Sequence, residues 1–349
     1  MRTGMSSTIS LISTGGTISE VGPGGGLAAG PTLHAADLLR SLPVAAELGE
    51  IRTVSAMSKR SDDITLRDLI DLAATVRREI DSGSVGVVVA LGTDTLEEAA
   101  FALDLLVESR APVVVTGAMR PHGALVTDGL ANLVSAIRVA RCPSARGLGT
   151  LVVFDDAIHA ARFVEKAHVS SLSAFQSRPV GPVGWLAEDR VRIGLRPGTE
   201  YHVKLTDRRP PVVVIARMSL GSDENLVAAL GSLGCDALIV EGFGGGHVPA
   251  AVVAQLGGLC ATVPVVISTR VASGEVLRAT YSGVGDELDL RARGLMSGGI
   301  LSSAKAHILI SLLLMEGISG DGLAQRFEQI ASGCPGESTR LDEPARQGE

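Results

Sequence analysis

Residues 9–17 read Ile9-Ser10-Leu11-Ile12-Ser13-Thr14-Gly15-Gly16-Thr17, and the interpretation of the whole chain starts from them. The apolar first half is typical of a buried strand, and the two glycines end it. Gly15 and Gly16 let the backbone turn sharply and leave room for another molecule to approach closely. The hydroxyl of Thr17 then lies just past the carboxyl end of a strand, where open α/β sheets place their ligand sites. Taken alone, the stretch is equally well explained as a tight turn with polar side chains.

A second stretch of the same kind favours a ligand site over a purely structural turn. Residues 85–91 form another apolar run of strand character, which ends in Gly92, Thr93 and Asp94. Because the carboxyl ends of parallel strands meet at one edge of a sheet, we expect the two threonine-bearing loops to lie together.

Composition limits the partners that the chain could have. It has 349 residues, of which 46% are hydrophobic and 3% aromatic, with a net charge of −7. An acidic chain with few aromatic side chains lacks both the basic surface and the stacking residues of nucleic-acid-binding proteins. No membrane span is expected either, because the apolar run at residues 308–315 is flanked by Lys305 and Glu316 and is predicted to be a buried helix.

Cofactors, metals and disulfides are not indicated by any motif. The four cysteines are scattered and the seven histidines show no ligand spacing, so reduced thiols and no metal site are expected. The glycine-rich residues 22–26 contain no dinucleotide-binding fingerprint, so no cofactor is predicted. Because the N-terminus lacks the apolar core of a signal peptide, we expect a cytoplasmic protein.

Strand and helix patterns alternate along the chain and predict an α/β fold in two domains. A larger, mostly parallel-sheet N-terminal domain is expected over residues 1–195, and a polar, irregular linker over 196–211. A smaller C-terminal α/β domain is expected over 212–334, followed by a disordered tail over 335–349. Within the first domain, Thr95 and Glu98 have the spacing of a helix capping box.

Two threonines and an aspartate on facing loops could supply part of what amide hydrolysis requires, provided that a base lies close by. That reaction needs a nucleophile, a base and donors for the oxyanion, and a lysine in a dry pocket can serve as the base. Five segments together resemble the bacterial-type L-asparaginases, or asparaginase/glutaminases, over most of the chain. They are STGGTI at 13–18, LGTDTLEEAA at 91–100, TGAMRP at 116–121, DGLAN at 128–132 and AIHAARFVEK at 157–166.

The resemblance implies a catalytic set of four residues. Thr17 is the nucleophile that takes the acyl group, and Thr93, Lys166 and Asp94 form a second hydroxyl–lysine–carboxylate set. Asp94 also binds the α-ammonium group of the substrate. Without the family, Lys166 would be read as an ordinary solvated surface lysine.

The resemblance also implies a binding set. Ser61, with Ser58 as the runner-up, holds the α-carboxylate, although Ser61 could equally be a turn or cap residue. The carbonyl of Ala118 contacts the amide, and Gly16 and Gly92 bring the backbone close to it.

Two further candidates lie beyond the linker. In the family, the glycine loop that His247 follows reaches a neighbouring subunit's site, and Tyr281 falls near another contact position; both could instead fill an interface. A homotetramer, with a homodimer as the minimum, is therefore expected. His159 and His168 are predicted to be structural.

The implied function is hydrolysis of L-asparagine to L-aspartate and ammonia through a threonine acyl-enzyme, with L-glutamine as a second substrate. Two departures keep alternatives open: residues 18–60 contain no tyrosine, and Leu91 stands where the family commonly has histidine. The alternatives are an amidase for a different small amide and a non-catalytic amino-acid-binding homologue.

Overall fold

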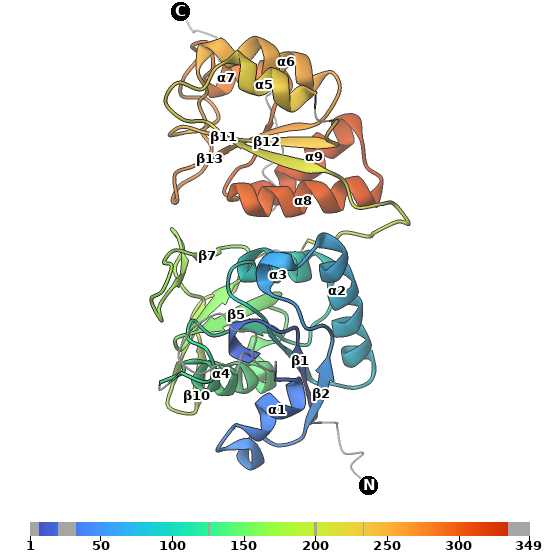
Figure 1. Cartoon of the computed structure of the whole chain (residues 1–349), viewed down its shortest axis with the longest axis vertical. Helices are drawn as coiled ribbons and strands as arrows, with labels where there is room; N and C mark the ends of the chain where they lie inside the picture. Colours follow the sequence, from blue (N-terminus) through green and yellow to red (C-terminus); the bar gives the residue numbers. More distant parts are fainter. Residues whose placement is uncertain (1–6, 20–32, 125, 199–200, 233, 334–349) are drawn as a thin grey trace, which may run out of the picture. The chain divides into compact units, whose positions relative to one another are not determined.

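The computed structural model describes residues 7–19, 33–124, 126–198, 201–232 and 234–333. Its contacts divide the chain into two compact units, Met1–Lys204 and Leu205–Glu349 (Figure 1). This division falls within the predicted linker. The glycine-rich residues 22–26 and the predicted tail lie outside the described residues.

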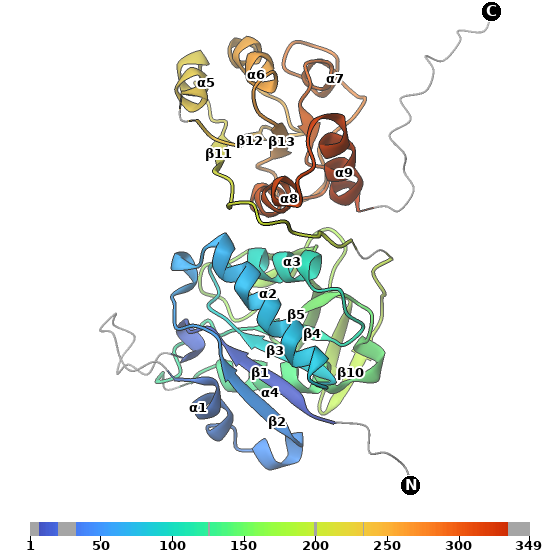
Figure 2. The ribbon, with the colours of Figure 1, turned by 90° about the vertical axis from the view of Figure 1, so that its right-hand side faces the viewer.

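Unit 1 is built on an eight-stranded sheet in the order β10-β9-β6-β5-β4-β3-β1-β2 (Figure 2). The strands from β1 to β5 are parallel, and β6, β9 and β10 extend the sheet with antiparallel pairs. The bounds are β1 (Ile9–Ser13), β2 (Ile51–Ser55), β3 (Gly86–Ala90), β4 (Val113–Thr116), β5 (Thr150–Phe154), β6 (Ala157–Ala160), β9 (Gly184–Ala187) and β10 (Arg190–Ile193).

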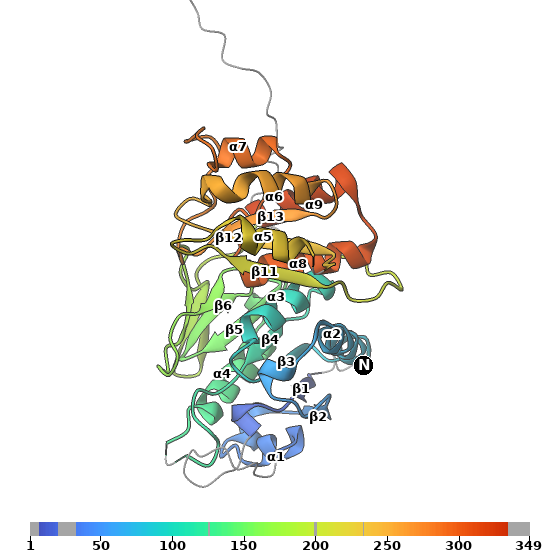
Figure 3. The same ribbon diagram turned by 45° about the horizontal axis from the view of Figure 1, so that its top comes forward.

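Helices cover both faces of this sheet, as its uniformly buried strands require. Helices α1 (Ala35–Arg40) and α4 (Gly129–Arg141) pack on one face, and α2 (Leu66–Asp81) and α3 (Leu96–Leu106) lie on the other (Figure 3). Every residue of β1, β3 and β5 is buried, which is why apolar residues predominate in these strands.

A separate two-stranded ladder, β7 (Val164–Lys166) with β8 (Phe175–Ser177), stands apart from the main sheet. Its link to β6 includes a 2.9 Å hydrogen bond between His159 Nδ1 and Ser177 Oγ. His159 is 2% exposed, and its Nε2 has no hydrogen-bond partner among the described residues. The geometry makes His159 a buried structural side chain, as predicted.

His159 should make unit 1 sensitive to acid. Burial lowers the pKa of its imidazole from 6.5 to about 4. Between these pH values the unfolded chain binds more protons, so the free energy of unfolding falls as the pH is lowered through that window. The loss is at most about 3 kcal/mol.

The single tryptophan, Trp185 on β9, allows this to be measured within unit 1. Urea unfolding followed by its fluorescence, from pH 7.5 down to pH 4, should show a shallower pH dependence for His159→Gln than for the wild type. Parallel pH profiles for the two proteins would show that His159 does not titrate on unfolding.

Unit 2 is a smaller α/β unit with a four-stranded, fully parallel sheet in the order β11-β12-β13-β14. Figure 1 shows α5 and α6 on one face and α8 on the other. The bounds are β11 (Val213–Arg217), β12 (Ala237–Gly242), β13 (Val265–Thr269), β14 (Met296–Ser297), α5 (Glu224–Gly231), α6 (Val253–Cys260), α7 (Glu287–Ala292), α8 (Ser303–Glu316) and α9 (Gly320–Ser332).

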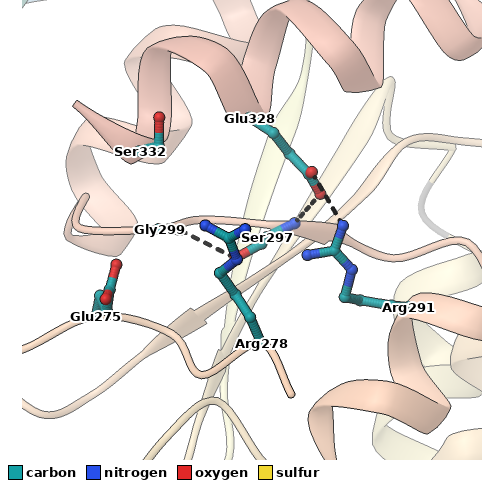
Figure 4. A pocket seen from close by; sticks show the side chains of 7 residues that line it. All are labelled: Glu275, Arg278, Arg291, Ser297, Gly299, Glu328 and Ser332. Carbon is teal, nitrogen blue, oxygen red and sulfur yellow. Dashed lines mark hydrogen bonds and ion pairs between the residues drawn. The ribbon is translucent and has the colours of Figure 1, made fainter. Parts of the chain in front are cut away.

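Glu328 connects the short edge strand β14 to the helices α7 and α9 through a hydrogen bond and an ion pair (Figure 4). Glu328 on α9 accepts a 2.9 Å hydrogen bond from the backbone N–H of Ser297. The same carboxylate pairs with Arg291 on α7 at 3.3 Å. Glu328 and Arg291 line a small pocket. Because Glu328 already compensates the positive charge of Arg291, no bound ligand is needed to explain the pair.

The predicted fold class is confirmed, and one local prediction is wrong. Thr95 stands at the N-cap of α3, but its side chain makes no capping hydrogen bond. Its hydroxyl donates instead to the carbonyl oxygen of Ser61 at 2.8 Å. The Thr95 hydroxyl thus bonds to a distant residue in place of the α3 backbone, and this bond connects the start of α3 to the loop that contains Ser61.

Candidate active site

The loop after β1 is shaped by close backbone contacts. Gly15 and Gly16 have φ angles of +99° and +80°, which side chains rarely tolerate. A Cβ on Gly16 would also lie 2.5 Å from the Cα of Gly92. Thr17 follows at the start of a 3₁₀ turn, partly exposed, and its hydroxyl has no hydrogen-bond partner among the described residues. The two glycine loops therefore touch, and the partly exposed Thr17 follows directly after the contact.

The loop after β3 meets a third segment, the 3₁₀ turn Ser61–Asp63. A Cβ on Gly92 would lie 2.8 Å from Ser61 Oγ, and the N–H of Asp94 donates to the same oxygen at 3.3 Å. Ser61 and Thr93 are each 6% exposed, whereas Ser58 is exposed. Of the two candidate serines, Ser61 is thus the one packed against the Thr93 loop.

Lys166 reaches this loop from β7. Its Nζ donates to Thr93 Oγ1 at 3.0 Å and to Asp94 Oδ1 at 2.6 Å. The lysine side chain is 18% exposed and the Asp94 side chain 64% exposed. An amine in contact with both a hydroxyl and a carboxylate can take the hydroxyl proton when it is neutral.

An open cavity of about 490 Å³ adjoins this contact. It is lined by Asp94 and Lys166 together with residues 167–169. The exposed carboxylate and the partly buried amine therefore face a space that could hold a small molecule.

The loop after β4 is held by side chains that the sequence analysis gave no role. Asp128 accepts hydrogen bonds from the N–H groups of Met119 at 3.0 Å and Arg120 at 2.9 Å. Asn132 Nδ2 donates to the carbonyl of Gly117 at 3.1 Å. These bonds bracket Ala118, which is fully buried. In the sequence, the polar residues Asp128 and Asn132 at the otherwise apolar start of α4 were the signal that could have identified this role.

His247 and Tyr281 lie together in unit 2, with ring centroids 5.3 Å apart. A third residue, which the sequence analysis missed, joins them: Glu287 Oε2 contacts His247 Nε2 at 3.2 Å. Glu287 Oε1 accepts from the N–H groups of Thr280 and Tyr281 at 2.6 Å each. Burial acts to raise the pKa of Glu287, but the backbone hydrogen bonds and His247 outweigh it, and the pKa is lowered.

Other classes of site find no support in the part of the chain that the structure covers. No group of three or more His, Cys, Asp or Glu side chains there is arranged to hold a metal ion. Among the same residues, no helix is long and apolar enough to cross a membrane.

Two family models match the chain. The N-terminal asparaginase domain matches residues 8–198, and the glutaminase/asparaginase C-terminal domain matches residues 212–327. The L-asparaginase of Bacillus licheniformis is 34% identical over 89% of this chain and 96% of its own length. The glutaminase-asparaginase of Pseudomonas aeruginosa is 35% identical over 78% of each chain.

A solved structure agrees with these matches. The crystal structure of a probable cytoplasmic L-asparaginase from Campylobacter jejuni superposes with a TM-score of 0.82, at 27% identity. The match covers 93% of this chain and 99% of that one. With both domains matched in order over nearly the whole length, the chain belongs to the asparaginase family.

Proposed function

We propose that this protein hydrolyses L-asparagine to L-aspartate and ammonia through an acyl-enzyme on Thr17, with L-glutamine as a second substrate. The observation that carries the proposal is the contact of Lys166 Nζ with Thr93 and Asp94, in a loop packed against the Gly16–Thr17 turn. The names of the relatives support the same substrates.

In the proposed first step, Thr17 Oγ1 attacks the side-chain amide carbon, and the C–N bond breaks as ammonia leaves with the hydroxyl proton. In the second step, neutral Lys166 takes a proton through the Thr93 hydroxyl from a water molecule. That water attacks the carbonyl carbon of the Thr17 ester, the bond from that carbon to Thr17 Oγ1 breaks, Oγ1 takes up a proton, and aspartate leaves. In this second step the proton of the attacking water has an acceptor at hand, because Lys166 Nζ contacts Thr93 Oγ1.

Binding is proposed to use opposite charges and backbone groups. The Asp94 carboxylate suits the α-ammonium group, and the Ser61 hydroxyl suits the α-carboxylate. The Ala118 carbonyl would accept from the amide N–H₂, and the Gly16 and Gly92 backbones let the substrate lie close to the strand ends.

Ammonia release from asparagine, glutamine and a panel of small amides tests the function. We expect asparagine to give the highest kcat/KM. Ammonia from another amide but not from asparagine would favour the alternative amidase. Aspartate binding by calorimetry without any ammonia release would favour a non-catalytic amino-acid-binding protein.

We also propose self-association as a homotetramer, with a homodimer as the minimum, in which His247 and Tyr281 face a partner's site. The Tyr281 side chain is half-exposed, and the backbone N–H of Tyr281 donates to the buried Glu287. This supports the role, because an aromatic side chain on an anchored backbone suits contact with another surface. Light scattering and an activity assay over a dilution series should show activity falling as the dimer dissociates. A fully active monomer would contradict the shared site.

A cytoplasmic location is proposed from the Campylobacter jejuni structure, whose protein is described as cytoplasmic. A relative from Haemophilus influenzae is described as a probable periplasmic L-asparaginase. Fractionation of the source cells, with activity assayed in each fraction, would distinguish the two compartments.

A further inference from the structure

Lys166 is held by its main chain as well as by its side chain. The carboxylate of Glu97 accepts a hydrogen bond from the backbone N–H of Lys166, with a separation of 2.5 Å between Glu97 Oε2 and the nitrogen. Glu97 lies in the first turn of α3, immediately after the loop that carries Thr93 and Asp94. The segment that runs from β3 through the loop into α3 therefore contacts both the backbone N–H and the side-chain amine of Lys166.

The ladder geometry explains why this N–H needs a partner outside β8. Lys166 pairs with Phe175, and the next pair inward to the turn is joined by a hydrogen bond from Ala167 N to Ala174 O. Because bonded and non-bonded pairs alternate in an antiparallel ladder, the N–H of Lys166 points away from β8. In this two-stranded ladder, β8 is the one strand paired with β7. The Glu97 carboxylate therefore accepts the hydrogen bond that the carbonyl of a strand on the other side of β7 would otherwise accept.

We infer that Glu97 is a positioning residue for the proposed reaction, which fixes the Lys166 main chain so that its amine stays in reach of Thr93. The inference rests on the proposed function of Lys166 as the base. A flexible four-carbon stem gives a lysine many rotamers, and main-chain anchoring restricts where the stem begins. Small displacements of a catalytic group cost large factors in rate.

An alternative role for Glu97 is purely structural: its negative charge would stabilise α3 by interacting with the positive N-terminal end of the helix dipole, as acidic residues in a first helical turn do. The two roles are separable by substitution. Glu97→Gln removes the charge but keeps an oxygen that can accept the Lys166 N–H, whereas Glu97→Ala removes both. A dipole role therefore makes the two variants alike, and a positioning role makes them differ.

The experiment compares wild type, Glu97→Gln, Glu97→Ala and Lys166→Met by two readouts. The first is amide hydrogen exchange in the peptide spanning residues 161–175, followed by mass spectrometry. The second is steady-state ammonia release from asparagine. We expect Glu97→Ala to exchange faster at Lys166 and to lose roughly 10- to 100-fold in kcat, with KM within about twofold of wild type. Glu97→Gln should remain close to wild type in both.

Unchanged exchange in Glu97→Ala would overturn the inference, as would a Gln variant impaired as severely as the Ala variant. If Lys166→Met loses activity while Glu97→Ala keeps it, the positioning role fails and the proposed function stands. If the wild type releases no ammonia, the proposed function fails, and the exchange rates still decide whether Glu97 anchors the Lys166 main chain.

Discussion

Thr17→Ala is expected to abolish ammonia release from asparagine, with a fall in kcat of about 10³-fold or more. The variant removes the oxygen that accepts the acyl group in the proposed reaction. The fold should be intact, because the Thr17 hydroxyl has no hydrogen-bond partner among the described residues. Activity and thermal unfolding of the same preparation measure both effects.

Thr17→Ser is the matched control, because serine keeps a hydroxyl on the same Cβ position. We expect it to retain measurable turnover and an unchanged Tm. A Thr17→Ala variant with near-native activity would remove Thr17 from the mechanism, whatever the behaviour of the serine variant.

Lys166→Met is the second large effect we expect. Methionine keeps most of the length of the apolar stem but has no amine, so the proton acceptor for the Thr93 hydroxyl is lost and kcat should fall about 10²- to 10⁴-fold. Stability should change by less than about 1 kcal/mol, because the Asp94 partner is 64% exposed and water screens the pair.

Lys166→Arg separates charge from basicity. Arginine keeps the positive charge beside Asp94 but stays protonated at any working pH. We expect the arginine variant to be as inactive as the methionine variant. Activity near wild type in Lys166→Arg would show that Lys166 is not the base.

The fold was predictable where strands are buried on both faces. β1, β3 and β5 are uniformly buried and predominantly apolar, so their sequence identifies them without tertiary information. Within unit 1, the strands after Phe154 were not predicted. β6 to β10 have three or four residues each, and β10 alternates between exposed and half-buried positions. Elements that short take their structure from their neighbours, and carry little periodicity of their own.

The site was predictable as a set of loops but not as a set of contacts. Glycines after two strands identify the Thr17 and Thr93 turns, because only glycine fits where the two backbones meet. The contacts of Lys166 with Asp94 and with Glu97 span 72 and 69 residues of sequence. No local pattern encodes such a pair, and only the family resemblance singled out Lys166.

Glu287 shows the same limit in unit 2. It lies 40 residues from His247 in the sequence, at the start of α7, and the sequence analysis gave it no role. Its burial, at 2% exposed, becomes visible only in the folded unit. The buried carboxylate organises both the His247 ring and the Tyr281 backbone, so it has a part in any role these two residues have.

The most direct test of the account is to locate the acyl group. Protein mixed with asparagine is quenched in acid within milliseconds, digested, and mapped by mass spectrometry. The account predicts a β-aspartyl ester on the peptide containing Thr17, absent from Thr17→Ala and accumulating in Lys166→Met. An ester on Thr93 or on any other residue, or ammonia release by Thr17→Ala at the wild-type rate, would contradict it.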